Sequence, residues 1–364
     1  SGKCGRPKRK PKTDKGSIYL TREVFRFDHC DDGNVRLFIG TKTNNIGYLS
    51  FKAHGKFEIP NSLYVRKERG HYYVSFCYEQ GQPDRKLSTN EEHLAFLQGA
   101  TREYLEEHTM GVDRGVAIPV CAGEQTYDFT HSQKKNMSKA DRYIKRLQRK
   151  LARQQKGSNR RAKTKHRIAV HHAKKANIRN DFAHKTSRLL VDSSAKIIVF
   201  EALRTARMTR RPKAKQDEQG RFISNKAKQK AGLNKSILNV GWHVIETYTY
   251  YKAYSSSKAV FKIPAPTTSQ ECAKCGHTHP DNRKTQALFV CGNCGNTDNA
   301  DHNASLVIKK RAINLILDTG TVLSGDGVLR TQSDSGRGGN RKTGRAKSST
   351  SSAQRSVKKE KLAA

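Results

Sequence analysis

Two Cys-x2-Cys pairs near the C-terminal end constrain the fold of this chain more than any other feature. The four cysteines form the pairs Cys272/Cys275 and Cys291/Cys294. The spacing between the pairs is typical of a four-cysteine zinc ribbon, in which each Cys-x2-Cys turn supplies two thiolates to one tetrahedral ion. Three glycines suit turns that need a positive φ: Gly276, Gly292 and Gly295. Because such a site has no open coordination position, we expect a structural zinc and not a catalytic one.

The alternative is a pair of disulfides. No segment resembling a secretory signal precedes the pairs, and the other cysteines show no pairing pattern. They lie at Cys4, Cys30, Cys77 and Cys121. A reducing compartment therefore fits better, and catalysis must be sought at other residues.

The charge balance indicates a polyanionic partner. The 364 residues carry 71 Lys and Arg against 32 Asp and Glu, a formal net charge of +39. Such a charge repels itself unless a polyanion neutralises it, so nucleic acid is the expected partner. A membrane is a weaker candidate because no run approaches the eighteen or more apolar residues of a spanning helix. With 34% hydrophobic residues, we expect two or three domains with a sizeable exposed part.

The N-terminal third predicts a small β domain. Residues 1–15 form a Gly/Pro/Lys/Arg arm without apolar periodicity, which we expect to be flexible. Five short apolar or alternating runs then predict strands, at 17–27, 35–39, 48–51, 62–66 and 72–78. A helix at 91–107 follows as a connector. We expect residues 16–107 to form a barrel or curled sheet.

The middle of the chain alternates strand and helix patterns. We expect a buried strand at 112–120, a second near 127–129, and strands at 195–201 and 260–263. Helices are predicted over 132–180, 238–254 and 306–317, the second rich in aromatic residues that we expect to pack beneath the ribbon or, less favoured, to stack on bases. Residues 204–230 predict a mobile loop, and the tail beyond Gly320 predicts disorder.

The first of these helical segments is strongly basic. Seventeen Lys and Arg stand between Gln133 and Lys175, against Asp141 alone, while Ile144, Leu147 and Leu151 recur at helical spacing. A solvated surface helix mixes both signs, so we expect one face to pack and the rest to contact nucleic acid. We assign the contacts to eight residues: Lys145, Arg146, Arg149, Lys150, Arg153, Arg160, Arg161 and Lys165.

Three carboxylates stand out by their placement. Asp113 interrupts an apolar strand, Glu201 ends another, and Asp301 stands at the entry to the last amphipathic helix. A carboxylate in or beside a buried strand is costly unless a cation or another ionised partner satisfies it. Magnesium or manganese prefers such hard oxygen ligands and also binds phosphate oxygens. A shared two-metal site for phosphodiester cleavage is one interpretation; a helix cap or a surface ion pair is the alternative for each residue alone.

The order of these motifs resembles one known family. Five segments are together similar to the TnpB family. They are the strand Gly-Val-Asp-Arg-Gly, the strand end Val-Phe-Glu-Ala-Leu, the segment from Gly232 to Trp242, the run Thr-Ser-Gln-Glu-Cys-Ala-Lys-Cys-Gly and the run Asn-Ala-Asp-His-Asn-Ala. These proteins are encoded by insertion sequences and are relatives of type V CRISPR effector nucleases. The resemblance covers residues 105–317 strongly and the preceding β region more loosely.

The resemblance implies a fold and a domain order. It implies an RNase H-like (RuvC) α/β core at 108–267, interrupted by a zinc ribbon at 268–298 and completed by a final segment at 299–318. A wedge-like β domain at 16–107 precedes this core and a disordered basic tail at 319–364 follows it. Asp113, Glu201 and Asp301 would be the catalytic triad that binds magnesium or manganese.

The resemblance also implies an activity. The chain would cleave double-stranded DNA, guided by an RNA made from the transposon end, in the cytoplasm of a prokaryote beside the nucleoid. Two alternatives stay open: a non-cleaving binder that regulates transposition or transcription, and a conventional transposase that joins DNA ends. The chain departs from the family pattern in two places, since no helical recognition segment is visible within the β domain and Ala300, not a basic residue, precedes Asp301.

Overall fold

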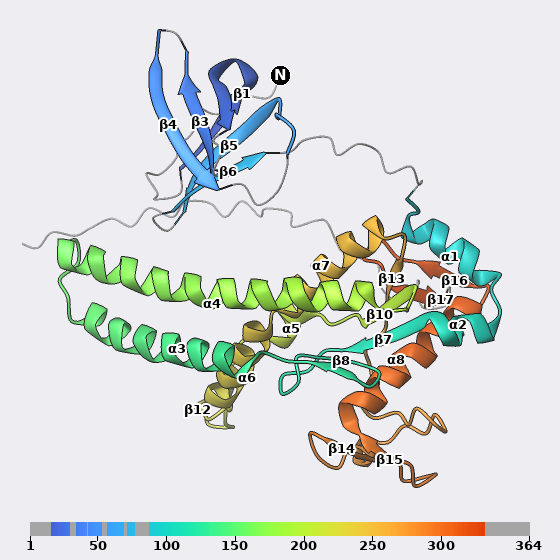
Figure 1. Ribbon diagram of the computed structural model, residues 1–364. Coiled ribbons are helices and arrows are strands. Elements are labelled where there is room, and N and C mark those ends of the chain that lie inside the picture. Colours follow the sequence, from blue (N-terminus) through green and yellow to red (C-terminus); the bar gives the residue numbers. More distant parts are fainter. Residues whose placement is uncertain are drawn as a thin grey trace, which may run out of the picture.

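A computed structural model describes residues 16–29, 34–41, 43–52, 57–68, 71–76 and 87–331 (Figure 1). The basic arm at 1–15 and the tail at 332–364 lie outside these residues. Within the described part of the chain, no helix has the length and apolar character needed to cross a bilayer.

The N-terminal strands form two antiparallel sheets that share one core. Their bounds are β1 Ser17–Thr21, β2 Phe25–His29, β3 Asn34–Gly40, β4 Asn45–Lys52, β5 Ser62–Glu68 and β6 His71–Phe76. One sheet has the order β1-β5-β6 and the other β2-β3-β4. The single strand expected at 17–27 is wrong, because a 3-10 turn at Arg22–Val24 carries the chain from one sheet to the other. The side chains of Leu37 and Leu63 are fully buried between the sheets.

A five-stranded sheet forms the centre of the second part. Its order is β13-β10-β7-β8-β9, and the strands are β7 Thr109–Asp113, β8 Val120–Ala122, β9 Gln125–Tyr127, β10 Ile197–Glu201 and β13 Ala259–Ile263. Strands β7, β10 and β13 run parallel, whereas β8 and β9 are antiparallel additions. Every residue of β10 is buried, which explains its continuous apolar run.

Helices cover both faces of this sheet. The helices are α1 Asn90–Gln98, α2 Arg102–His108, α3 His131–Ala152, α4 Asn159–Asp192, α5 Thr205–Met208, α6 Ala227–Val240, α7 Trp242–Ser255 and α8 Ala300–Leu317. Ile198 and Phe200 pack with α4, α6 and α7, while Ile197 and Val199 pack with α1, α2 and α8. The alternation of side chains along β10 therefore divides the core into two layers, one on each face of the sheet.

The α3–α4 hairpin extends away from the sheet (Figure 1). Thr130 and Gln133 form a capping box at the start of α3, and Ser158 caps α4. Ile144 and Leu147 of the predicted apolar stripe are buried, together with Ala140, whereas Leu151 is half-buried at the end of the helix.

Glycines divide two helices that the sequence pattern joined. The predicted helix 91–107 breaks between Gly99 and Thr101, and the predicted helix 238–254 breaks at Gly241. Gly241 has φ +78°, a conformation that glycine adopts without strain. The expectation that the aromatic residues of α7 pack beneath the ribbon is wrong. The Tyr248 ring stacks on His184 of α4 with centroids 4.0 Å apart, and the Trp242 indole donates to the Gly115 carbonyl at 2.9 Å.

Two segments are more ordered than expected. The predicted loop 204–230 contains α5, the start of α6 and a hairpin of β11 Lys215–Gln216 and β12 Phe222–Ile223. The predicted disordered tail contains a hairpin of β16 Thr321–Leu323 and β17 Leu329–Thr331. Leu329 is fully buried in the core beside α8, and Val328 bridges Lys262 of β13. The folded part therefore continues at least to residue 331.

Candidate carboxylate and four-cysteine sites

The sheet topology brings two of the three carboxylates to the same edge. Asp113 is the last residue of β7 and Glu201 is the last residue of β10. These strands are parallel neighbours, with Val112 paired to Phe200, so their carboxyl ends meet. The strand expected to continue to residue 120 is wrong, because β7 ends at Asp113. This difference places the carboxylate at an edge, where a ligand can reach it.

Helix α8 supplies the third carboxylate. Asp301 lies in its first turn, and the side chain of Asn299 caps that turn by accepting from the amide nitrogens of Asp301 and His302 at 2.9 and 3.2 Å. The helix begins at Ala300, six residues earlier than the apolar pattern indicated.

Gly111 allows α8 to lie directly against β7. A Cβ atom at this position would stand 2.6 Å from the backbone nitrogen of Lys309 and in contact with the carbonyl oxygen of Ser305. No side chain fits in that space, so the absence of one permits the close approach of helix and strand. Ser305 also accepts from the backbone nitrogen of Gly123 at 3.2 Å, which ties the same helix to the β8–β9 turn.

The three carboxylates interact electrostatically. Burial, together with the nearby negative charges of Glu201 and Asp301, raises the pKa of Asp113 to about 7. Burial also raises the pKa of Glu201 and of Asp301 above their ordinary values. The structure thus brings the three predicted site residues into one acidic, poorly solvated cluster.

Two residues near the cysteines hold these carboxylates. The Thr268 hydroxyl donates to Glu201, and Arg283 donates to the Asp301 carboxylate at 3.1 Å. Arg283 also donates to the Gln286 carbonyl at 3.0 Å. Among the described residues, the four cysteines alone have ligand atoms all within 4.8 Å of one another, so the carboxylate oxygens are less tightly gathered. Sequence reasoning missed both partners, since neither has a distinguishing local signal.

An ion-pair network of Arg114, Glu246 and Lys262 holds the main chain at the end of β10. Arg114 donates to the backbone carbonyl of Glu201 and to the Glu246 carboxylate, the latter at 2.6 Å. Lys262 donates to the other oxygen of Glu246 at 3.1 Å. Burial would raise the pKa of Glu246, but Arg114 and Lys262 outweigh it and hold this pKa below its ordinary value. The network fixes the position of the main chain beside Asp113.

The four cysteines are arranged as a tetrahedral metal site requires. Sγ of Cys272 lies 3.8 Å from Sγ of Cys294, and Sγ of Cys275 lies 3.6 Å from Sγ of Cys291. Tetrahedral zinc with Zn–S bonds of about 2.3 Å places its sulfurs about 3.8 Å apart. No disulfide joins the described cysteines, which removes the disulfide alternative for the two pairs.

Two equivalent turns present these thiols. The amide nitrogen of Gly276 donates to the Cys272 carbonyl, and that of Gly295 donates to the Cys291 carbonyl. These glycines have φ values of +77° and +68°, as predicted, whereas Gly292 is not among the residues of positive φ. The second turn connects β14 Leu288–Val290 to β15 Thr297–Asn299, which pair as a hairpin (Figure 1).

Buried asparagines attach residues 270–299, the four-cysteine hairpin that contains both turns, to the rest of the fold. Asn282 donates to the carbonyls of Gln270 and His277 and accepts from Gly292, which joins the two turns. Asn303, on α8, accepts from the Ala273 amide at 3.0 Å and donates to the Glu271 carbonyl at 2.7 Å. The hairpin is therefore fastened to the helix that carries Asp301.

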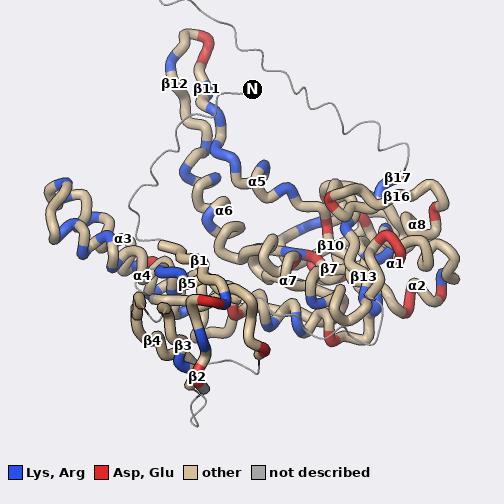
Figure 2. The backbone as a smooth tube through the Cα atoms, turned by 90° about the horizontal axis from the view of Figure 1, so that it is seen from above, with Lys and Arg blue, Asp and Glu red and all other residues tan. Residues whose placement is uncertain are grey.

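The eight predicted nucleic-acid residues all lie on or between α3 and α4 (Figure 2). Seven of them are exposed. Arg161 is half-buried, and its guanidinium donates to the carbonyls of Leu151 and Gln154, the latter at 3.0 Å. It closes the end of α3 and is less available to a ligand than the others.

A basic cavity of about 1210 Å³ lies between this hairpin and α6. The ammonium group of Lys175, buried at its wall, donates to Asp141 at 2.6 Å and to Asn239 at 3.2 Å. Other basic residues line the same cavity: Arg142, Lys145, Arg179, Arg211, Lys228 and Lys235.

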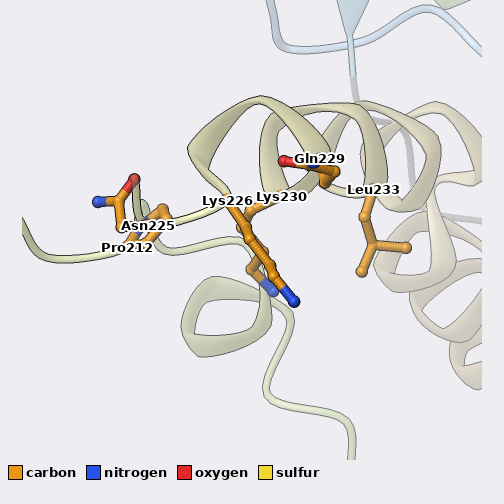
Figure 3. A pocket seen from close by; sticks show the side chains of 6 residues that line it. All are labelled: Pro212, Asn225, Lys226, Gln229, Lys230 and Leu233. Atoms are coloured by element: carbon orange, nitrogen blue, oxygen red, sulfur yellow. The ribbon is translucent and has the colours of Figure 1, made fainter. Parts of the chain in front are cut away.

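A smaller hollow lies at the start of α6. Lys226 and Lys230 extend side by side along it, with Leu233 beyond them and Pro212 and Asn225 at the other end (Figure 3). Lys226 has φ +56°, so the chain turns sharply into the helix here. Positive charge thus continues from α3 and α4 to α6 and the β11–β12 hairpin (Figure 2).

Fold and site together define a mixed α/β protein in which a four-cysteine hairpin is fastened beside a buried carboxylate cluster. Two family models match the chain: "Probable transposase" (OrfB of IS605) over residues 75–211, and "Cas12f1-like, TNB domain" over residues 242–308.

Two curated relatives align with most of the chain. One, from Escherichia coli (strain K12), is named "Putative RNA-guided DNA endonuclease InsQ" and is 36% identical over 288 residues, which are 78% of this chain and 64% of the relative. The other is "CRISPR-associated endodeoxyribonuclease Cas12f1" of Sulfoacidibacillus thermotolerans, 27% identical over 263 residues, covering 69% of this chain and 53% of the relative. The chain is thus similar to the TnpB (OrfB) family in both matched regions, and it spans about half to two thirds of the length of these relatives.

A solved structure of the "mini-RNA-guided endonuclease CRISPR-Cas_phi3" has a TM-score of 0.42 with this chain at 12% identity, covering 77% of this chain and 57% of that one. That similarity is too low to support a conclusion about function.

Proposed function

We propose that this chain is an RNA-guided DNA endonuclease that hydrolyses phosphodiesters at the cluster of Asp113, Glu201 and Asp301. The observation that carries the proposal is that three carboxylates, distant in sequence, meet at one edge of the sheet with raised pKa values. The names of the two curated relatives give the guide and the target: RNA for guidance and DNA for cleavage. In this proposal the sheet and its helices are an RNase H-like (RuvC) core, and the N-terminal β part is the wedge domain.

The carboxylate cluster fits divalent cations. Three acidic oxygens in a poorly solvated site repel one another, and a cation bound among them would relieve that repulsion. Magnesium or manganese, when bound, would activate water and stabilise the leaving oxygen of the phosphodiester. Asp113, Glu201 and Asp301 would hold the metal, while Thr268 orients the Glu201 carboxylate. Arg283 lies where it can bind a phosphate oxygen, because its partner Asp301 faces the same cluster.

The four cysteines would hold a structural zinc. Their thiols occupy all four positions of a tetrahedral site, so no position remains for substrate or water. The zinc would stabilise the turns that fasten Thr268 and Arg283 beside the carboxylates, through Asn282 and Asn303. Its contribution to cleavage would therefore be indirect.

Guide RNA from the transposon end and target duplex DNA would bind the basic surfaces. Positive charge is offered by the seven exposed basic residues of α3, α4 and their connection, and by the cavity beside α6. In that cavity Asp141 pairs with Lys175 and Lys235, and the remaining basic residues of the lining outnumber it. Contacts of this kind go to phosphates and carry no sequence information, as expected where base pairing with a guide selects the target.

The test is to purify the chain with its bound RNA and measure magnesium-dependent cleavage of a matched DNA duplex. We expect guide-directed double-strand breaks that Asp113→Ala abolishes without changing the amount of bound RNA. Bound RNA with no metal-dependent cleavage would instead support a regulatory binder. Joined DNA ends, in place of simple breaks, would support a conventional transposase.

A further inference from the structure

The outer face of the β1-β5-β6 sheet is an exposed aromatic surface. Along β5 the side chains alternate: Leu63 and Val65 are buried, whereas Tyr64 and Arg66 are exposed. Strand β1 repeats the pattern with buried Leu20 beside exposed Tyr19. Because side chains alternate across a strand, the exposed residues of both strands share one face of the sheet.

The register gathers three tyrosines and one arginine on this face. Tyr19 pairs with Tyr64, and Arg66 pairs with Tyr73. The rings of Tyr19 and Tyr64 have centroids 4.9 Å apart, and the Arg66 guanidinium lies 5.6 Å from the Tyr73 centroid. Tyr19, Tyr64 and Tyr73 are 54%, 50% and 45% exposed. Exposed aromatic side chains that are clustered mark an interaction surface more often than single exposed ones do.

The charge of these strands favours an anionic partner. They carry Arg66 and Lys67 against one acidic residue, Glu68. A partner that presents both negative charge and flat aromatic surfaces matches tyrosines with an arginine between them. Unpaired nucleotides have both, because each base has a π-face for stacking and each phosphate a charge for the guanidinium.

We propose that Tyr19, Tyr64 and Tyr73 form a platform on which unpaired nucleotides of the RNA partner stack, while Arg66 binds an adjacent phosphate. This inference rests on the proposed function, which supplies RNA as the partner. RNA is favoured over the DNA because folded RNA presents unpaired bases in loops and ends, whereas the bases of a duplex target are already stacked inside it.

The position of Tyr72 provides a matched control. It is the neighbour of Tyr73 on β6, is 61% exposed, and lies over Lys67 with the ammonium 5.4 Å from its centroid. Being one residue along the strand, it points to the opposite face. If RNA affinity depends on stacking at the outer face, Tyr72→Ala should bind RNA as tightly as the unaltered chain does.

The experiment measures the affinity of the full chain, freed of RNA, for a short fluorescent oligouridine RNA at high salt. High salt suppresses the contribution of phosphate contacts and leaves stacking exposed. We expect Tyr64→Ala and Tyr73→Ala each to weaken binding about 5- to 150-fold, the equivalent of about 1–3 kcal/mol per stacked base. Tyr64→Phe should bind as the unaltered chain does, and blunt RNA duplex should bind equally to all variants.

Two further variants separate stacking from other effects. Tyr64→Leu keeps an apolar side chain in the strand, so a folded protein with weakened binding shows that the ring itself is needed. Arg66→Gln should reduce the slope of affinity against salt by about one phosphate contact, whereas Tyr64→Ala should leave that slope unchanged.

Several outcomes would overturn the inference. Equal losses in Tyr64→Ala and Tyr72→Ala, or equal losses for duplex and single-stranded RNA, would show that the face is not a stacking platform. Unchanged RNA affinity with an altered oligomeric state would show that a second copy of the chain covers it. A further outcome separates the two proposals. If Asp113→Ala abolishes guided cleavage while Tyr64→Ala binds RNA normally, the platform is rejected and the proposed function stands.

Discussion

The four cysteines and the three carboxylates reach their positions in opposite ways. The cysteines come from two neighbouring turns of the same hairpin, and their sulfur atoms already stand at the spacing that a tetrahedral ion needs. The carboxylates come from two strand ends and a helix, and Thr268 and Arg283 bind two of them. The first site depends on local turn geometry, whereas the second depends on the packing of α8 against the sheet. The two sites are nevertheless joined, because both partners of the carboxylates flank or lie within the cysteine hairpin.

The largest effect is expected from removal of a zinc ligand. Cys272→Ser should reduce the zinc content from about one ion per chain to none, since structural zinc contributes about 10–16 kcal/mol of binding free energy. Cys272 is fully buried, and loss of the ion should unfold the hairpin and release Arg283 and Thr268. Metal analysis and guided cleavage measure the two consequences.

A buried cysteine outside the cluster is the control. Burial, with the negative charge of Asp113, raises the pKa of Cys121 to about 12, so its thiol stays protonated. Cys121→Ala should therefore keep its zinc. If Cys272→Ser retains both zinc and full cleavage, the two sites are not joined through the hairpin.

The second effect concerns pH. The pKa of Asp113 is about 7 in the folded chain, above its ordinary value of 3.8, so the folded state binds the proton more tightly than the unfolded state. The stability that this proton provides is complete below the ordinary pKa and is lost as the pH rises through about 7. In magnesium-free buffer at pH 8, Asp113→Asn should therefore raise the free energy of unfolding by up to about 4 kcal/mol, measured by denaturant unfolding.

Added magnesium should remove this advantage, because only the carboxylate can bind the ion. Asp192→Asn makes the same chemical change at an exposed position of α4 and should leave the pH dependence as it was. The difference in unfolding free energy between Asp113→Asn and the unaltered chain should be larger at pH 8 than at pH 4. An equal difference at both pH values would contradict the clustering of charge.

The smallest of these effects comes from a single methyl group. Gly111→Ala should destabilise the chain by about 1–3 kcal/mol, because its Cβ would meet the backbone of α8. Any shift of α8 moves Asp301 away from Asp113, so cleavage should fall further than stability.

Gly232→Ala is the matched control. Gly232 lies within α6 with no atom within 4 Å of the added Cβ, so the same change should stabilise the helix by up to about 1 kcal/mol. The opposite signs, measured by denaturant unfolding, test whether the close approach of α8 is needed. A neutral Gly111→Ala would show that the helix can shift without harm.

The features that could be predicted from the sequence are those whose signal is local. Cysteine spacing predicts the sulfur cluster, because each turn is set by two cysteines and a glycine of positive φ. A continuous apolar run predicts β10, since both faces of that strand are buried. The position of Glu201 at a strand end follows from the same run. That of Asp113 does not, because its apolar pattern continues to residue 120 whereas β7 ends at Asp113.

The features that could not be predicted depend on contacts between distant segments. Arg283 is one basic residue among many, and only the packing of the hairpin on α8 pairs it with Asp301. The hairpin β16–β17 has strands of three residues, too short to give a pattern, and burial of Leu329 orders it. The break at Gly241 separates two segments that are both helical in composition.

The most direct measurement is the binding of manganese, followed by electron paramagnetic resonance, to the unaltered chain and to Asp113→Asn, Glu201→Gln and Asp301→Asn. If the three carboxylates form one divalent-cation site separate from the cysteines, each substitution will weaken manganese binding and all three variants will keep their zinc. Manganese binding that is unchanged in all three variants, or that disappears only when zinc is lost, would contradict a shared carboxylate site.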